Sequence, residues 1–278
     1  MSHFTVLIIG GNIEDQLEGF NEDITMPRYE KGEVSEEDKK QFVDYYTKAK
    51  EANKNLTFEE LYEKEGKGWN DNSWKFRRGI WVETSTYNPN SKWDWYKIGG
   101  RWEGMLMDKQ GNPCNSGLIS ELDFLTPRVE AEETALKYFD EVSALFKGGK
   151  VPQPKLTWEQ ILGAGHIGDI DTKRKFYHNQ TAMIEIAKVK EENRDKFGFF
   201  FEPADFKCTR EEYGKRAFNG AFSTYAMLKD GEWFEKGQMG WWGMSNDEFT
   251  QADWDIEMNK MLDSLEDDVE VTIVDCHI

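Results

Sequence analysis

The sequence contains few histidines, cysteines and prolines, and it has far fewer basic than acidic residues. Its 278 residues include four histidines, three cysteines and seven prolines, with 35 basic residues against 53 acidic ones. The cysteines, Cys114, Cys208 and Cys276, are odd in number and far apart, which argues against a disulfide framework and against a Cys-x-x-Cys metal site. We therefore expect a protein of a reducing cytoplasm that holds neither a metal nor a cofactor.

Long hydrophobic runs are also missing. No apolar run approaches the ~18 residues that a transmembrane helix needs, and no charged-then-apolar leader opens the sequence, so we expect no membrane association. The formal charge of −18 would repel phosphate backbones at long range, which argues against general DNA or RNA binding. A small anionic ligand in a local cationic pocket stays compatible with this charge, and so does a basic protein partner.

Two nearly continuous apolar runs, His3–Ile9 and Val269–Ile278, stand at opposite ends of the chain. Such runs are typical of strands that are buried on both faces. We expect both strands in one central mixed β-sheet with helices packed around it, which makes the chain a single α+β domain. If these strands are antiparallel neighbours, His3 should lie near Cys276 and His277.

The predicted domain spans residues 1–278, and its polar, Lys/Glu-rich segment 27–72 is expected to form a helical insertion. Within it, Ser35 and Thr57 have the spacing to downstream acidic residues that marks a helix start. Elsewhere, Thr126-Pro127, Thr157 and Thr209 predict further helix starts, residues 171–196 predict helix with a break near Asn179, and 247–265 predicts an amphipathic helix. Asp230-Gly231 predicts the tight turn of a β-hairpin.

An aromatic segment, Asn88–Trp102, surrounds the Gly99-Gly100 pair. Aromatic rings can stack on a nucleobase, which is worth roughly 1–3 kcal/mol per base, and an arginine can bind a phosphate through two hydrogen bonds. Together with a second aromatic and glycine cluster, this segment supplies the candidate ligand-binding residues Trp93, Trp95, Tyr96, Arg101, Trp102, Trp241 and Trp242. The alternative is an aromatic corner of the core with Arg101 in a structural ion pair.

His3 and His277 are the candidate catalytic residues. His3-Phe4-Thr5 fits the His-x-Thr pattern of the two-histidine phosphoesterases, but no second copy of the pattern exists. A His3/His277 acid–base pair could replace it if the terminal strands are antiparallel. The alternative is that both histidines are hydrogen-bonded structural residues.

A zinc site that combines these two histidines with Asp275 and Cys276 is a further alternative. Cys276 and His277 should point to opposite faces of a strand, however, which argues against shared ligation.

Several motifs of the chain resemble a family of proteins encoded by bacteriophages and prophages. The family opens with Met-Ser-His-Phe-Thr-Val-Leu, as this chain does, and the further matches are Trp93–Trp102, Thr209–Tyr213, Ser223–Gly231, Met239–Gly243 and Val274–Ile278. The resemblance implies a phage origin, and hence a viral protein working in the host bacterial cytoplasm. It supplies no biochemical activity and no catalytic residues.

From these observations we expect a counter-defence or host-takeover protein that binds a small nucleotide, such as a signalling nucleotide, in a Trp/Arg pocket. Sequestration is favoured over turnover because no complete catalytic set is visible. The second hypothesis is an acidic inhibitor or nucleic-acid mimic that acts on a host enzyme or defence protein through carboxylates such as those of Asp263–Glu270. A nucleotide phosphoesterase is the third, and a homo-oligomer stays open.

Overall fold

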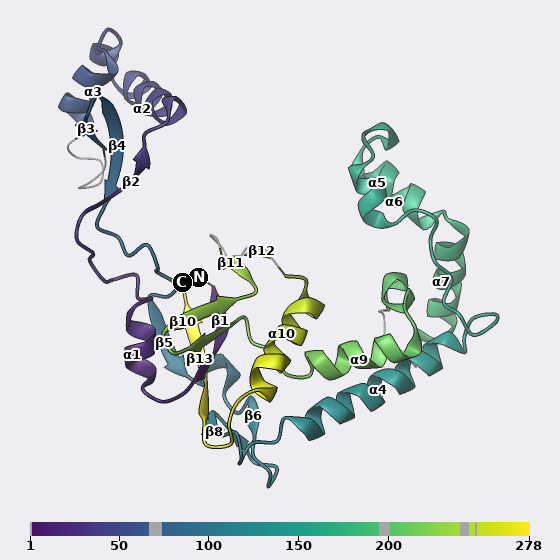
Figure 1. The fold of residues 1–278 in the computed structure, drawn as a ribbon. Helices are drawn as coiled ribbons and strands as arrows, with labels where there is room; N and C mark the ends of the chain where they lie inside the picture. Colours follow the sequence, from purple (N-terminus) through teal and green to yellow (C-terminus); the bar gives the residue numbers. More distant parts are fainter. Residues whose placement is uncertain (1, 67–73, 195–200, 240–244, 248) are drawn as a thin grey trace.

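The centre of the protein is a mixed β-sheet that contains both ends of the chain (Figure 1). The computed structural model describes residues 2–66, 74–194, 201–239, 245–247 and 249–278. The strands follow the order β10-β9-β1-β13-β5, and β8 also pairs with β13. Their bounds are β1 His3–Ile9, β5 Trp95–Ile98, β8 Ser116–Leu118, β9 Ala226–Lys229, β10 Glu232–Glu235 and β13 Glu270–His277.

The two terminal strands are antiparallel neighbours, as the sequence predicts. His3 pairs with His277 and Phe4 pairs with Cys276, while β1 runs parallel to β9 on its other side. Val6, Leu7 and Ile8 have no exposed surface, which confirms that this strand is buried on both faces. The predicted α+β domain with a mixed sheet is therefore confirmed.

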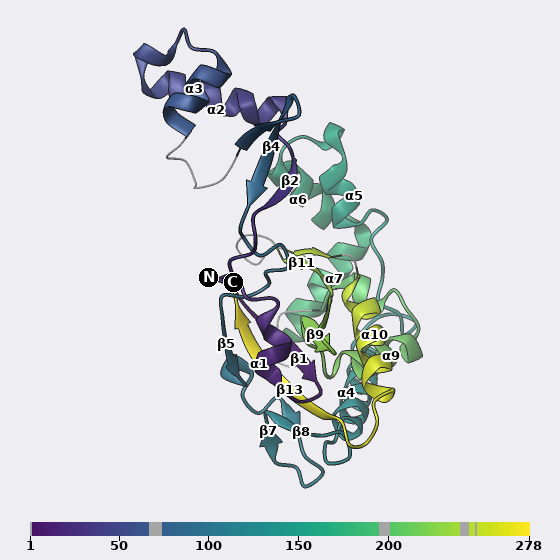
Figure 2. The same cartoon turned by 60° about the vertical axis from the view of Figure 1, so that its left-hand side comes forward.

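Helices cover both faces of this sheet (Figures 1 and 2). On one face Leu7 belongs to the same buried cluster as Met258 of α10, and on the other Ile8 clusters with Leu17 of α1. Because side chains alternate between the two faces along β1, the strand contributes residues to two separate cores. The other elements of this body are α1 Ile13–Glu18, η3 Gly100–Trp102, β6 Leu106–Met107, β7 Pro113–Cys114, β11 Gly237–Met239, β12 Ser245–Asp247 and α10 Gln251–Asp263.

Of two local predictions in the body, one is confirmed and one needs adjustment. Asp230 and Gly231 both have positive φ, 53° and 76°, as a type I′ turn between β9 and β10 requires. The amphipathic helix predicted over 247–265 is present but shorter, because Thr250 caps it and Gln251 is its first residue.

The predicted insertion stands apart from the body (Figure 1), and it is not purely helical as expected. A three-stranded sheet of order β2-β4-β3 supports its helices, and it continues past residue 72 to Ser85. The two strands after residue 72 form a hairpin turned at Arg78-Gly79. The elements are β2 Tyr29–Glu33, α2 Glu36–Ala49, η1 Glu51–Asn53, α3 Phe58–Glu65, β3 Trp74–Arg77 and β4 Ile80–Ser85.

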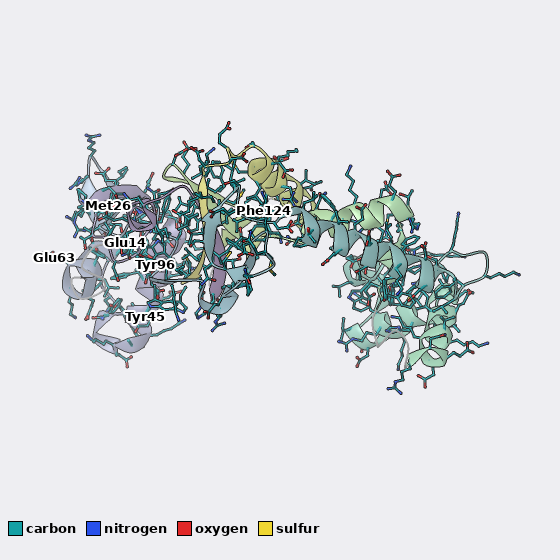
Figure 3. All side chains as sticks on the ribbon, turned by 90° about the horizontal axis from the view of Figure 1, so that it is seen from below. Glu14, Met26, Tyr45, Glu63, Tyr96 and Phe124 are labelled. Carbon is teal, nitrogen blue, oxygen red and sulfur yellow. The ribbon has the colours of Figure 1, made fainter. Side chains whose placement is uncertain are left out.

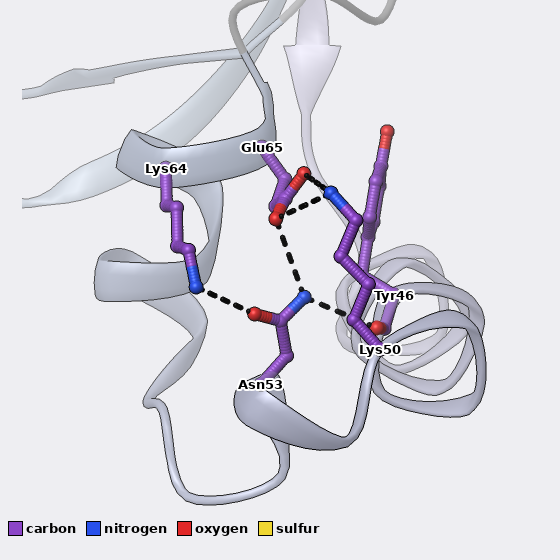
Figure 4. A network of polar contacts seen from close by, with 5 residues as sticks. All are labelled: Tyr46, Lys50, Asn53, Lys64 and Glu65. Atoms are coloured by element: carbon purple, nitrogen blue, oxygen red, sulfur yellow. Dashed lines mark hydrogen bonds and ion pairs between the residues drawn. The ribbon is translucent and has the colours of Figure 1, made fainter.

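Polar contacts join the two helices of the insertion (Figure 4). The buried Asn53 side chain donates to the Tyr46 carbonyl at 3.2 Å and accepts from Lys64 Nζ at 2.8 Å. Lys50 Nζ lies 2.8 Å from a Glu65 carboxylate oxygen. The predicted helix starts at Ser35 and Thr57 are both present, each with its side chain accepting a backbone N–H three residues on.

A helical arm leaves the body at Phe124, labelled in Figure 3, and has a core of its own. Helix α4 begins at Leu125, ahead of the predicted Thr126 cap, because Asp123 accepts the Thr126 N–H instead. The predicted caps at Thr157 and Thr209 and the break at Asn179 are confirmed. The arm contains α4 Leu125–Ser143, α5 Trp158–Gly163, η4 Gly165–Ile167, α6 Ile170–His178, α7 Thr181–Glu192, η5 Pro203–Phe206 and α9 Arg210–Gly220.

Candidate active site

His3 and His277 lie side by side where the chain begins and ends. They are directly opposed in the β1–β13 ladder, so their side chains emerge on the same face of the sheet. Their ring centroids are 5.0 Å apart and the ring planes meet at 71°. The two candidate catalytic residues are therefore brought together, as antiparallel terminal strands require.

Each histidine is hydrogen-bonded to its own aspartate. His3 Nδ1 lies 2.8 Å from Asp275 Oδ1, and His277 Nδ1 lies 2.6 Å from Asp94 Oδ1. A carboxylate on Nδ1 holds the ring in one orientation and favours the tautomer that carries its proton on Nδ1. The Nε2 atom of each ring is then the one that can take or give a proton.

The two pairs differ in their access to solvent. The side chains of His3 and His277 are 17% and 13% exposed, so both rings reach the surface. Asp275 is 2% exposed and Asp94 is 32% exposed. The His3 pair therefore rests on a buried carboxylate, and the His277 pair on one that water reaches.

The Gly99-Gly100 turn holds the buried carboxylate in place. The backbone N–H of Arg101 donates to Asp275 Oδ2 at 3.0 Å. Gly100 has φ +54°, and a Cβ atom there would lie 2.3 Å from the Asp275 Cβ. Only glycine allows the turn to approach this aspartate so closely, which explains why a glycine stands at position 100.

The predicted hollow of aromatic rings is wrong in its composition. Trp93 is 7% exposed, donates its indole N–H to the Leu17 carbonyl and packs against Tyr96 in the α1-side core. Trp102 packs against the core cluster on the α10 side. Within β5, consecutive residues point to opposite faces, so Trp95 and Tyr96 cannot both line one pocket.

Trp95 and Arg101 are the members of that prediction that remain at the surface near the histidines. Trp95 is 48% exposed, pairs with His277 across the ladder and lies edge-on to the His3 ring at 6.1 Å. Arg101 is exposed, and its guanidinium makes no ion pair within the described part of the chain, contrary to the structural alternative. Trp241 and Trp242 lie outside the described residues.

Cys276 contributes nothing to this face. It is fully buried in the α1-side core, and burial raises the pKa of its thiol far above the ordinary value, so the thiol stays protonated. Among the residues that the structure describes, no three histidine, cysteine or acidic side chains are placed to hold a metal ion. The zinc alternative raised by the sequence thus finds no support in the described geometry.

Sequence reasoning missed the carboxylate partners. The sequence pattern presents Asp275 only as a possible zinc ligand and does not single out Asp94. The signal for Asp275 was present, because residues two apart on a strand share a face and Asp275 precedes His277 by two. Asp94 could not be found this way, since its position depends on how the chain returns from the insertion.

Two sizeable cavities lie on the arm, away from the histidines. One of about 740 Å³ is lined by Trp158, Tyr177 and side chains of both charges, and one of about 600 Å³ lies beside Cys208. Among the described residues, the His178 ring on the wall of the first cavity has no hydrogen bond to a carboxylate, unlike His3 and His277. We therefore take the histidine pair, and not the larger cavities on the arm, as the candidate site.

Comparisons with known proteins do not assign the chain to a family. Within the described segments, no helix has both the length and the apolar character to cross a membrane. No protein-family model, no curated protein and no solved structure matches the chain, so its function is inferred from the geometry of the site.

Proposed function

We propose that His3 and His277 form a general acid–base pair that cleaves a phosphate ester of a small nucleotide. The observation that carries this proposal is the arrangement of the two histidines. Both imidazoles reach solvent, their ring centroids are 5.0 Å apart, and each has an aspartate hydrogen-bonded to its Nδ1. One such pair is common as a structural contact. Two that face each other supply both a proton acceptor and a proton donor within reach of one substrate group.

The reaction needs one neutral and one protonated ring. The neutral imidazole takes a proton from water at Nε2 while the water oxygen bonds to phosphorus. The P–O bond to the leaving group breaks, and the other imidazole gives its Nε2 proton to the leaving oxygen. Asp94 and Asp275 orient the rings and stabilise whichever ring is charged.

The exposed Trp95 ring supports a nucleotide as the substrate class. It lies on the same face as the histidines and is open to stacking by a base. The resemblance to phage-encoded proteins supports a role in counter-defence or host takeover, in which a signalling nucleotide would be removed. The acid–base geometry favours turnover over the sequestration that the sequence alone suggested.

Sequestration without turnover is the second candidate. The exposed Trp95 indole and the Arg101 guanidinium, which has no ion-pair partner among the described residues, also favour it, because both could hold a nucleotide that the histidines do not cleave. The inhibitor hypothesis stays a prediction: the carboxylates of Asp263 and Asp267 are exposed, as a protein-binding face requires.

The test measures binding and cleavage of one panel of nucleotides. The panel contains linear, 2′,3′-cyclic and 3′,5′-cyclic nucleotides and cyclic dinucleotides. Calorimetry measures binding, and chromatography of the incubated ligand measures cleavage. We expect cleavage of at least one class by the unaltered protein, and about 10²–10⁴-fold slower cleavage by His3→Asn or His277→Asn. A ligand that binds and is recovered unchanged would establish sequestration instead. Absence of both, with a host protein co-purifying, would favour the inhibitor.

A further inference from the structure

We infer that Lys97 and Arg101 form a cationic pair that holds a non-reacting phosphate of the substrate beside the histidines. The inference rests on the proposed function and names the substrate class more narrowly. The expected substrate is a nucleotide that carries a terminal phosphate or diphosphate in addition to the ester that reacts. Lys97 was not among the residues that the sequence singled out.

Lys97 is placed by the sheet. It is directly opposite Asp275 in the β13–β5 ladder, two residues after Trp95. Residues that oppose each other in an antiparallel pair, and residues two apart on one strand, share a face. Lys97 therefore emerges on the same face as the two histidines and Trp95, next to the His3–Asp275 pair.

Arg101 is placed by the turn. Its backbone N–H is bonded to Asp275 Oδ2, so its Cα lies close to the same carboxylate that Lys97 opposes. The turn η3 also packs along β13. The two cations thus start from two different elements and flank one aspartate.

Neither cationic side chain has a charged or hydrogen-bonded partner within the described chain. Both side chains are exposed, and neither makes an ion pair or a side-chain hydrogen bond to a described residue. Arg128, by contrast, is buried and paired with Asp263. In a protein with a formal charge of −18, two cations that flank one aspartate of the candidate site, and that have no partner among the described residues, are available to an anion.

The charges at the site explain why two cations are needed. Asp94 and Asp275 place two negative charges behind the imidazoles, and these would repel an anionic substrate. Lys97 and Arg101 offset both charges. A phosphate that is not being cleaved can then bind next to the reacting ester, and the forked guanidinium suits a phosphate in particular.

The experiment uses inorganic pyrophosphate as the probe, because it carries the anionic group without a base or a cleavable ester. Isothermal calorimetry compares the unaltered protein with Lys97→Ala, Arg101→Ala and the double variant. The control is the double variant Lys147→Ala with Lys155→Ala, which removes the same charge from exposed positions on the arm. Thermal unfolding of each variant checks that the fold is kept.

We expect the unaltered protein to bind pyrophosphate, and each single substitution at the site to weaken binding by about tenfold or more, since a charge-assisted hydrogen bond is lost. The arm control should stay within about twofold, as expected for distant surface charges. Absence of pyrophosphate binding, or equal weakening by the control, would overturn the inference.

The same variants separate this inference from the proposed function. Pyrophosphate binding that depends on Lys97 and Arg101, with no nucleotide cleaved by any form, would leave the inference standing and refute the acid–base proposal. Cleavage that depends on His3 and is unchanged in the Lys97/Arg101 double variant would do the reverse. If both hold, the double variant should raise KM for a phosphorylated nucleotide with a smaller change in kcat.

Discussion

Substituting His3 in two ways distinguishes a catalytic histidine from one that only stabilises the packing of β1 against β13. Alanine removes both ring nitrogens. Asparagine removes Nε2 but keeps a donor, because its amide nitrogen is two bonds from Cβ, as Nδ1 is. The Asp275 hydrogen bond at 2.8 Å can therefore survive in His3→Asn and cannot survive in His3→Ala.

The contacts of His3 determine how much unfolding free energy each of the two variants should lose. In His3→Ala the Asp275 carboxylate stays buried and keeps only the Arg101 N–H as a partner. Losing a charge-assisted hydrogen bond to a buried carboxylate costs about 2–3 kcal/mol. The edge-on contacts of the His3 ring with His277 and Trp95 add about 0.5–1 kcal/mol. We therefore expect about 3 kcal/mol for His3→Ala, and for His3→Asn only the ring-contact loss of about 1 kcal/mol.

Urea unfolding followed by circular dichroism measures the free energy of unfolding, and the nucleotide assay measures cleavage. Both variants should lose about 10²–10⁴-fold in cleavage, because both lack Nε2. Equal destabilisation by Asn and Ala would refute the role given to the hydrogen bond. Full cleavage activity in His3→Asn would refute the role given to Nε2.

Two further predictions concern the surroundings of the site. Gly100→Ala should lower the free energy of unfolding by about 2–4 kcal/mol and impair cleavage, because its Cβ would collide with Asp275. Gly111 also has positive φ but has free space around it, so Gly111→Ala should cost only about 1 kcal/mol of backbone strain. Thermal unfolding compares the two variants. Burial raises the pKa of Cys276, so the stability that its neutral thiol contributes is complete below the unfolded pKa of about 8.5–9 and is lost as pH rises above it. In that pH range the slope of the free energy of unfolding should therefore be about 1.4 kcal/mol per pH unit more negative in the unaltered protein than in Cys276→Ala. Identical slopes in urea titrations would contradict the buried thiol.

The juxtaposition of His3 and His277 could be predicted because apolar runs at both chain ends define two strands, and an antiparallel register then pairs their outer residues. The identity of Asp94 as a partner could not, since it enters from a segment that returns from the insertion. The sheet of the insertion was also missed. Its strand Tyr29–Glu33 is almost entirely charged or exposed and has no period-two pattern to detect.

The aromatic prediction failed for a different reason. Counting rings in Asn88–Trp102 suggested one pocket, although strand geometry already requires Trp95 and Tyr96 to face opposite sides. Trp93 then joins the core because its indole finds a carbonyl partner there. A ligand face can be predicted from such a segment only after its residues are divided between the two faces.

The most direct test of the acid–base claim is the pH dependence of kcat/KM for the best nucleotide in the panel, measured for the unaltered protein, His3→Asn and His277→Asn. A pair that works as one acid and one base requires opposite protonation states, so the profile of the unaltered protein should be bell-shaped. Each substitution should remove one limb of the bell along with most of the rate. A profile whose shape and height are the same in all three proteins would contradict the account.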